Sequence, residues 1–116
     1  MRRVLIMLAV IGISVTLAGI ASAQDKVQIE RAMKVYADQK CSICHAIDGK
    51  GNAKGTLDSI GAKLKADEIR EWLVNPVEMA TKAKADRKPV MKAYATLPKE
   101  DLDALVAYLS SLKKKS

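Results

Sequence analysis

The sequence has few aromatic residues for its length. Among 116 residues there is no Phe, one Trp and three Tyr. Aromatic side chains contribute the largest buried apolar areas in protein cores, and a domain of about 90 residues has little interior to begin with. We therefore expect a bound group, rather than side chains alone, to fill part of the interior.

Cysteine and histidine are also scarce, with two Cys and one His in the whole chain. Two cysteines permit one disulfide at most, which excludes a fold held together by several of them. A structural zinc site normally takes four Cys or His ligands, and this chain offers three in total. A thioredoxin-like redox pair is expected within a βαβ pattern, and the sequence shows no strand pattern.

The first 23 residues differ from the rest. A positive start, Met1 to Arg3, precedes the apolar stretch Val4 to Leu17 and the small residues Ala21 to Ala23. This order predicts a secretory signal peptide over residues 1–23 and a single domain over residues 24–116. The alternative is an uncleaved membrane anchor, since about 20 residues span a bilayer. In both cases the domain works outside the cytoplasm.

The charge of the exported chain is moderately basic. Without Arg2 and Arg3 it has 18 Lys and Arg against 13 Asp and Glu, a net charge of +5. This balance suits an acidic protein surface or an anionic membrane. No basic stripe is interleaved with aromatic residues, so nucleic-acid binding is not expected.

The apolar spacing predicts an all-α domain. One helix is expected from about Lys26 to Gln39, with Asp25 as its N-cap and Met33 on its buried face. A second runs from about Asp67 to Pro76, and a third follows Pro98, where leucines recur at helical spacing through Leu112. The glycine-rich part, residues 49–61, and residues 77–95 are predicted to be loops, the latter with at most one helical turn.

One short motif carries chemistry. Cys41-Ser42-Ile43-Cys44-His45 is the C-x-x-C-H signature of c-type haem attachment. Each thiol can add to one haem vinyl group, and the histidine directly after the second cysteine can reach the iron. The motif occurs once and predicts one haem, bound through Cys41, Cys44 and His45.

The second axial ligand cannot be another histidine of this chain, because His45 is the only one. Methionine is a soft ligand that favours reduced iron and raises the potential. Met33, Met79 and Met91 are the candidates. Met91 is preferred because it lies in a loop before the last helix, Met79 is the alternative, and an open sixth position is the third reading.

The sequence resembles the class I cytochrome c family. The resemblance rests on the haem motif, on Met91 ahead of the last helix, and on the ending Leu102 to Leu109. It implies a fold in which the first and last helices cross and loops enclose the haem, with Met33, Tyr36, Tyr108 and Leu109 as candidates for that crossing.

The resemblance also has gaps. Members often have a proline after the haem motif whose carbonyl accepts a hydrogen bond from the histidine, but here Lys54 to Leu57 contains none. Lys92 follows Met91 where a proline is common. Trp72, in the middle helix, is expected either to donate to a haem propionate or simply to pack.

These features predict a soluble, monomeric, periplasmic electron carrier rather than an enzyme. The basic residues around Met91 (Lys82, Lys84, Arg87, Lys88 and Lys92) are expected to steer acidic redox partners to the haem edge. Two rivals remain: an electron-transfer subunit of a larger oxidoreductase complex, and an open-site protein for gas binding or peroxidatic chemistry.

Overall fold

The computed structural model describes residues 11–12 and 18–114, with the side chains of its first helix described from Asp25 onward. The predicted signal peptide, and the membrane anchor that is its alternative, fall mostly outside these residues and stay predictions. None of the helices in the described ranges has an apolar stretch long enough to cross a membrane.

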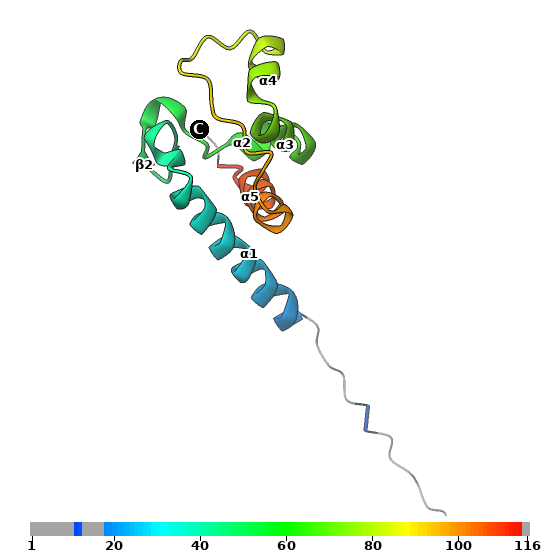
Figure 1. Ribbon diagram of the computed structural model, residues 1–116. Coiled ribbons are helices and arrows are strands. Elements are labelled where there is room, and N and C mark those ends of the chain that lie inside the picture. Colours follow the sequence, from blue (N-terminus) through cyan, green and yellow to red (C-terminus); the bar gives the residue numbers. More distant parts are fainter. Residues whose placement is uncertain (1–10, 13–17, 115–116) are drawn as a thin grey trace, which may run out of the picture.

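Helices dominate the described chain (Figure 1), so the prediction of an all-α fold is confirmed. The α-helices are α1 (Ala18–Asp38), α2 (Ile60–Lys63), α3 (Ala66–Val74), α4 (Pro76–Lys82) and α5 (Lys99–Ser111). Two 3-10 turns, η1 (Cys41–Ile43) and η2 (Ala53–Gly55), and two short strands, β1 (Ala46–Ile47) and β2 (Lys50–Gly51), lie between α1 and α2.

The first and last helices pack against each other and carry the core (Figure 1). From α1, Ala32 and Val35 are buried, and from α5 the stripe at i, i+3, i+4 and i+7 is buried: Leu102, Leu105, Val106 and Leu109. This spacing places the α5 residues on one face of the helix, so a single side of α5 serves the interior.

The first helix departs from its prediction in two ways. It begins at Ala18 and not near Lys26, so Asp25 lies within the helix instead of capping it. Three alanines between positions 18 and 23 are strong helix formers and allow this extension. Met33 is 54 % exposed and is not part of the core. The buried side of α1 carries Ala32 and Val35 and faces α5. Met33 directly follows Ala32 and is rotated from it by about 100° around the helix axis, so it points away from that side.

The middle of the chain also differs from the prediction. Pro76 ends α3, as expected, but also opens α4, which has seven residues where a loop with at most one helical turn was predicted. Proline suits this first helical position because its missing N–H has no partner there. After Lys82 the chain is irregular up to Pro98, as predicted.

Two strands appear where only a loop was predicted. β1 and β2 pair antiparallel around a turn in which Asp48 and Gly49 both have positive φ, at 51° and 77°. Positive φ at both central residues is the geometry of a tight two-residue hairpin turn. Each strand has two residues, which is too short for an alternating pattern to be visible in the sequence.

The third helix is attached to α5 by apolar packing and by one ion-pair group. Ile69 and Leu73 are buried in the common core, while Arg70 donates to Asp103 at 2.6 Å and Lys99 donates to the same carboxylate at 2.8 Å. The hydrogen bonds from Lys99 and Arg70 hold the pKa of Asp103 below its usual value. This attachment fixes the face of α3 that carries Trp72.

Candidate functional site

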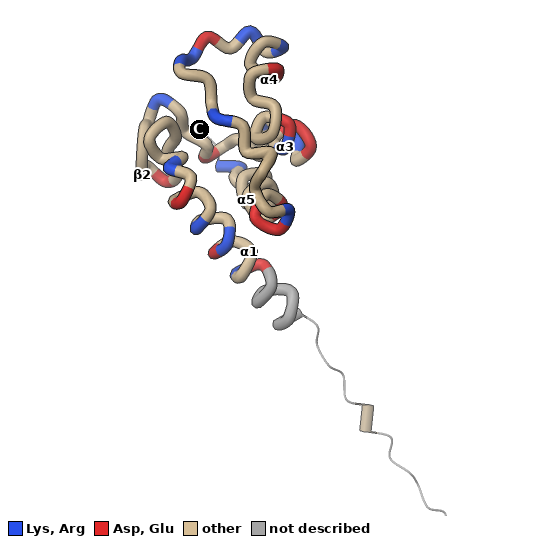
Figure 2. Tube along the Cα trace, in the orientation of Figure 1, with Lys and Arg blue, Asp and Glu red and all other residues tan. Residues whose placement is uncertain are grey.

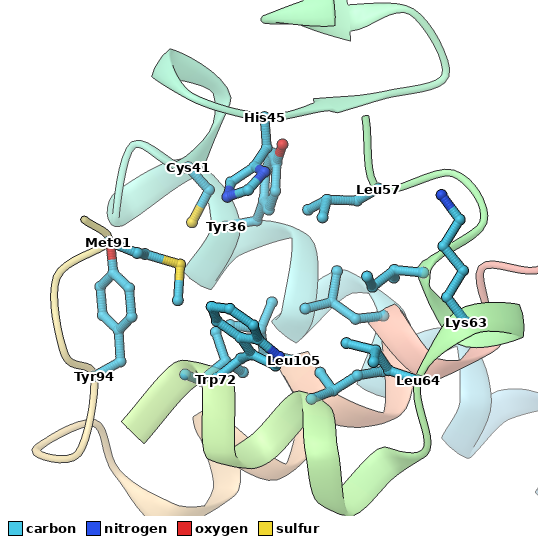
Figure 3. Close-up of a pocket in the computed structure, with 14 residues that line it drawn as sticks. Tyr36, Cys41, His45, Leu57, Lys63, Leu64, Trp72, Met91, Tyr94 and Leu105 are labelled. Carbon is cyan, nitrogen blue, oxygen red and sulfur yellow. The ribbon is translucent and has the colours of Figure 1, made fainter. Parts of the chain in front are cut away.

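A cavity of about 350 Å³ opens between the helices and the loops (Figure 3). Its volume lies within the range of ligand pockets, which is about 300–1,000 Å³. The lining is almost entirely apolar or aromatic: Tyr36, Cys41, His45, Leu57, Ile60, Lys63, Leu64, Ile69, Trp72, Leu73, Met91, Tyr94, Leu105 and Leu109. Side chains from α1, α2, α3 and α5 thus surround a space that they do not fill.

The haem motif forms a tight turn at the top of this cavity. Lys40 adopts a left-handed conformation that ends α1, and the amides of Cys44 and His45 both donate to the carbonyl of Cys41. The turn directs Cys41 and His45 into the cavity (Figure 3). Cys44 is partly buried but is not among the lining residues. Both thiols are free, and burial raises the pKa of Cys41.

One ring nitrogen of His45 is hydrogen-bonded within the protein. Its Nδ1 lies 2.9 Å from the carbonyl oxygen of Gly55, and a carbonyl only accepts, so Nδ1 carries the proton and Nε2 keeps a free lone pair. Burial lowers the pKa of His45, with a further lowering from the charge of Arg87. Both effects favour the neutral imidazole that binds metals.

Gly55 therefore supplies the carbonyl for which the sequence offered no candidate. A Cβ at this position would collide with the Cys44 carbonyl and the Arg87 guanidinium, so only glycine fits the close approach. The amide of Asn52 also donates to the carbonyls of Ser42 and His45. Gly55 and Asn52 were not predicted as site residues, and the run of glycines after the motif was the available signal.

The three candidate methionines lie in different surroundings. Met91 lines the cavity, and Figure 3 shows its thioether directed into the same space as the His45 imidazole. Met79 is partly buried on α4 and is not among the lining residues, and Met33 is exposed on α1. The amide of Tyr94 donates to the Leu73 carbonyl at 2.8 Å and ties the Met91 segment to α3.

Two polar aromatic residues also face the cavity. Trp72 lines it. The hydroxyl of Tyr36 is buried and lacks a hydrogen-bond partner among the described residues, and burial raises its pKa to about 12. Buried hydroxyls normally have a partner, so this unpaired donor fits a cavity that receives a further group.

The residues present fit a c-type haem. The cavity is apolar, one free thiol and one imidazole with an available Nε2 face it from the same turn, and a thioether faces it from the opposite loop. Across the described ranges, no three or more His, Cys, Asp and Glu residues are grouped to hold a bare metal ion. The chemistry of the donor set thus matches haem and not zinc.

Comparison with known families agrees with this geometry. The family model "Cytochrome c" matches residues 29–113, which is most of the chain. The chain belongs to the cytochrome c family. The predicted class I resemblance is thereby confirmed, and with it the general function, haem-based electron transfer with haem c bound covalently.

One curated relative is also similar to this cytochrome. Over 89 residues it is 30 % identical to "Cytochrome c oxidase subunit 2" of Alkalihalophilus pseudofirmus, an alignment that covers 69 % of this chain and 24 % of the relative. The chain thus spans about a quarter of that protein's length. No solved structure matches this cytochrome.

Proposed function

We propose that this cytochrome is a periplasmic, monohaem carrier of single electrons, and not an enzyme. The haem is attached to Cys41 and Cys44, and its iron is bound by His45 and Met91. The observation that carries the proposal is that His45, Cys41 and Met91 face one apolar cavity. A single C-x-x-C-H motif and a single histidine support one haem per chain.

The bound haem supplies the chemistry, since its iron takes up and releases one electron. The chain's own residues hold and tune it. The Gly55 carbonyl accepts a hydrogen bond from Nδ1 of His45 and so orients the ring. This hydrogen bond also makes Nε2 more basic and therefore a stronger ligand for the iron. The thioether of Met91 favours the reduced state. The apolar walls around Leu105 and Leu109 exclude water from the site.

The same proposal gives the basic segment a partner-docking role. Five basic residues at the end of α4 and in the irregular segment on both sides of Met91 are exposed: Lys82, Lys84, Arg87, Lys88 and Lys92. Figure 2 shows basic positions along this part of the chain. Lys82 is paired with Glu78, whereas Lys84, Lys88 and Lys92 have no ion pair with any described residue. These three charges are therefore available to an acidic redox partner.

A second candidate is an electron-transfer subunit of a larger complex. It is favoured by the similarity to a protein named as an oxidase subunit. A free carrier is expected to run as a monomer in size-exclusion chromatography. Its rate of electron transfer with an acidic partner is expected to fall steeply between about 0.01 and 0.15 M salt, because the electrostatic screening length shrinks from about 30 to 8 Å. Co-purification with larger polypeptides, at a salt-independent rate, would instead support the subunit.

The covalent attachment is tested by mass. The exported protein is expected to contain one haem per chain and a polypeptide that begins at Gln24. Because thioether bonds survive acid-acetone extraction, the haem is expected to stay with the protein during this treatment. Mass spectrometry of the intact protein and of the fragment around Cys41 and Cys44 measures both. An exported protein of normal stability with a Cys41–Cys44 disulfide and no haem would refute the assignment.

A further inference from the structure

One arginine connects the Met91 loop to the haem motif. Arg87 lies in the irregular segment between α4 and α5, and its Nη2 donates to the carbonyl of Cys44, 43 residues earlier in the chain. The guanidinium also covers Gly55 so closely that a Cβ there would collide with it. We call this contact of Arg87 with Cys44 and Gly55 the Arg87 clasp.

Within the part of the chain that the structure describes, the clasp is the sole hydrogen-bonded anchor of residues 86–93. Among the described residues, no backbone or side-chain group of residues 86–93 other than Arg87 hydrogen-bonds to the rest of the chain. The next anchor is Tyr94, whose amide donates to Leu73. Met91 therefore sits on a span held at one end by the Arg87 clasp and at the other by α3.

The distance along the chain makes the anchor relevant to Met91. Met91 lies four positions after Arg87, so the backbone between them spans at most about 14 Å. While Arg87 is bound to the Cys44 carbonyl, the thioether of Met91 stays near the cavity. Without this contact the segment from Asp86 to Ala93 gains conformational entropy that opposes its closure over the cavity.

The clasp also places charge beside the histidine. The guanidinium lies over the Cα of Gly55, the residue whose carbonyl accepts from His45 Nδ1. A cation held next to the residues that orient His45 would disfavour the more positive ferric state of a haem bound there and so would raise its reduction potential.

We propose that Arg87 is a positioning residue that clasps the Met91 loop to the haem motif, keeping the sixth ligand in place and raising the potential. This inference rests on the proposed His45 and Met91 ligation. From the sequence, Arg87 was predicted only as part of a docking surface.

The test uses the purified holoprotein and imidazole, which binds ferric iron when Met91 leaves. In Arg87→Gln the Met91 loop loses one charge-assisted hydrogen bond, so imidazole replaces Met91 more easily and its affinity is expected to rise roughly tenfold. The reduction potential of this variant is expected to fall. Arg87→Lys keeps the positive charge but lacks the planar guanidinium with its fixed set of N–H donors. The reduction potential of this variant is therefore expected to stay near that of the wild type, while its imidazole affinity rises.

The matched control is Lys54→Gln, which removes one exposed charge next to Gly55 without touching the clasp; its imidazole affinity is expected to stay within about threefold of the wild type. An unchanged affinity in Arg87→Gln, or an equal rise in Lys54→Gln, would overturn the clasp. The sulfur-to-iron band of the wild type is read separately: its absence contradicts the ligation itself, and its presence with unchanged affinities contradicts the clasp alone.

Discussion

The double variant Cys41→Ala/Cys44→Ala, produced without haem, is expected to be molten or largely disordered. The cavity of about 350 Å³ would then lie open in the middle of the core. At about 24 cal/mol per Å³ of unfilled cavity, this corresponds to a loss on the order of 8 kcal/mol. Small domains have a total stability of roughly 5–15 kcal/mol, so the remaining apolar contacts would not hold one structure.

Amide NMR dispersion and near-ultraviolet circular dichroism measure this outcome, since a molten state keeps helices but loses fixed packing. The control is Ser42→Ala in the same turn, an exposed position at which haem attachment and fold are expected to be unchanged. Well-dispersed amide signals from the haem-free double variant would show that the polypeptide builds its own core, contrary to this expectation.

Replacing Met91 by Ala is expected to remove the ferric sulfur-to-iron absorption band and to leave the iron high-spin or bound by water or a lysine. The reduction potential is expected to fall by more than about 59 mV, the shift equivalent to a tenfold change for one electron, because the lost thioether favoured ferrous iron. Redox titration and the visible spectrum measure both effects.

Met79→Ala is the matched control, since Met79 is partly buried but does not line the cavity. It is expected to leave the band and the potential nearly unchanged. If the band were lost in Met79→Ala and kept in Met91→Ala, the ligand assignment would be reversed while the electron-carrier function would stand. A wild-type protein without the band would instead favour an open sixth position.

Local signals in the sequence predicted the parts of the fold that depend on neighbouring residues. The stripe from Leu102 to Leu109 predicted α5, and Pro76 marked the end of α3. The C-x-x-C-H motif named Cys41, Cys44 and His45, because attachment chemistry requires these residues at this spacing. Each of these signals lies within a few residues of what it predicts.

The errors arose where packing or a very short element decides. Met33 has helical spacing and an apolar side chain, yet it is exposed, because α5 packs on another side of α1 and none of the other helices described covers Met33. The hairpin of β1 and β2 is too short to leave a pattern, and α4 begins at the same proline that ends α3. Propensity is a weak guide in such places, since tertiary contacts override it.

The sequence by itself determined the helical class, the haem motif and the shortage of apolar side chains for a core. The tertiary structure alone decided which carbonyl holds His45, since the choice of Gly55 depends on a loop folding back over the motif. It also brought Met91 and Arg87, more than 40 residues after the motif, to the cavity and to Cys44. Contacts between distant segments depend on how the helices pack, and no local spacing encodes that.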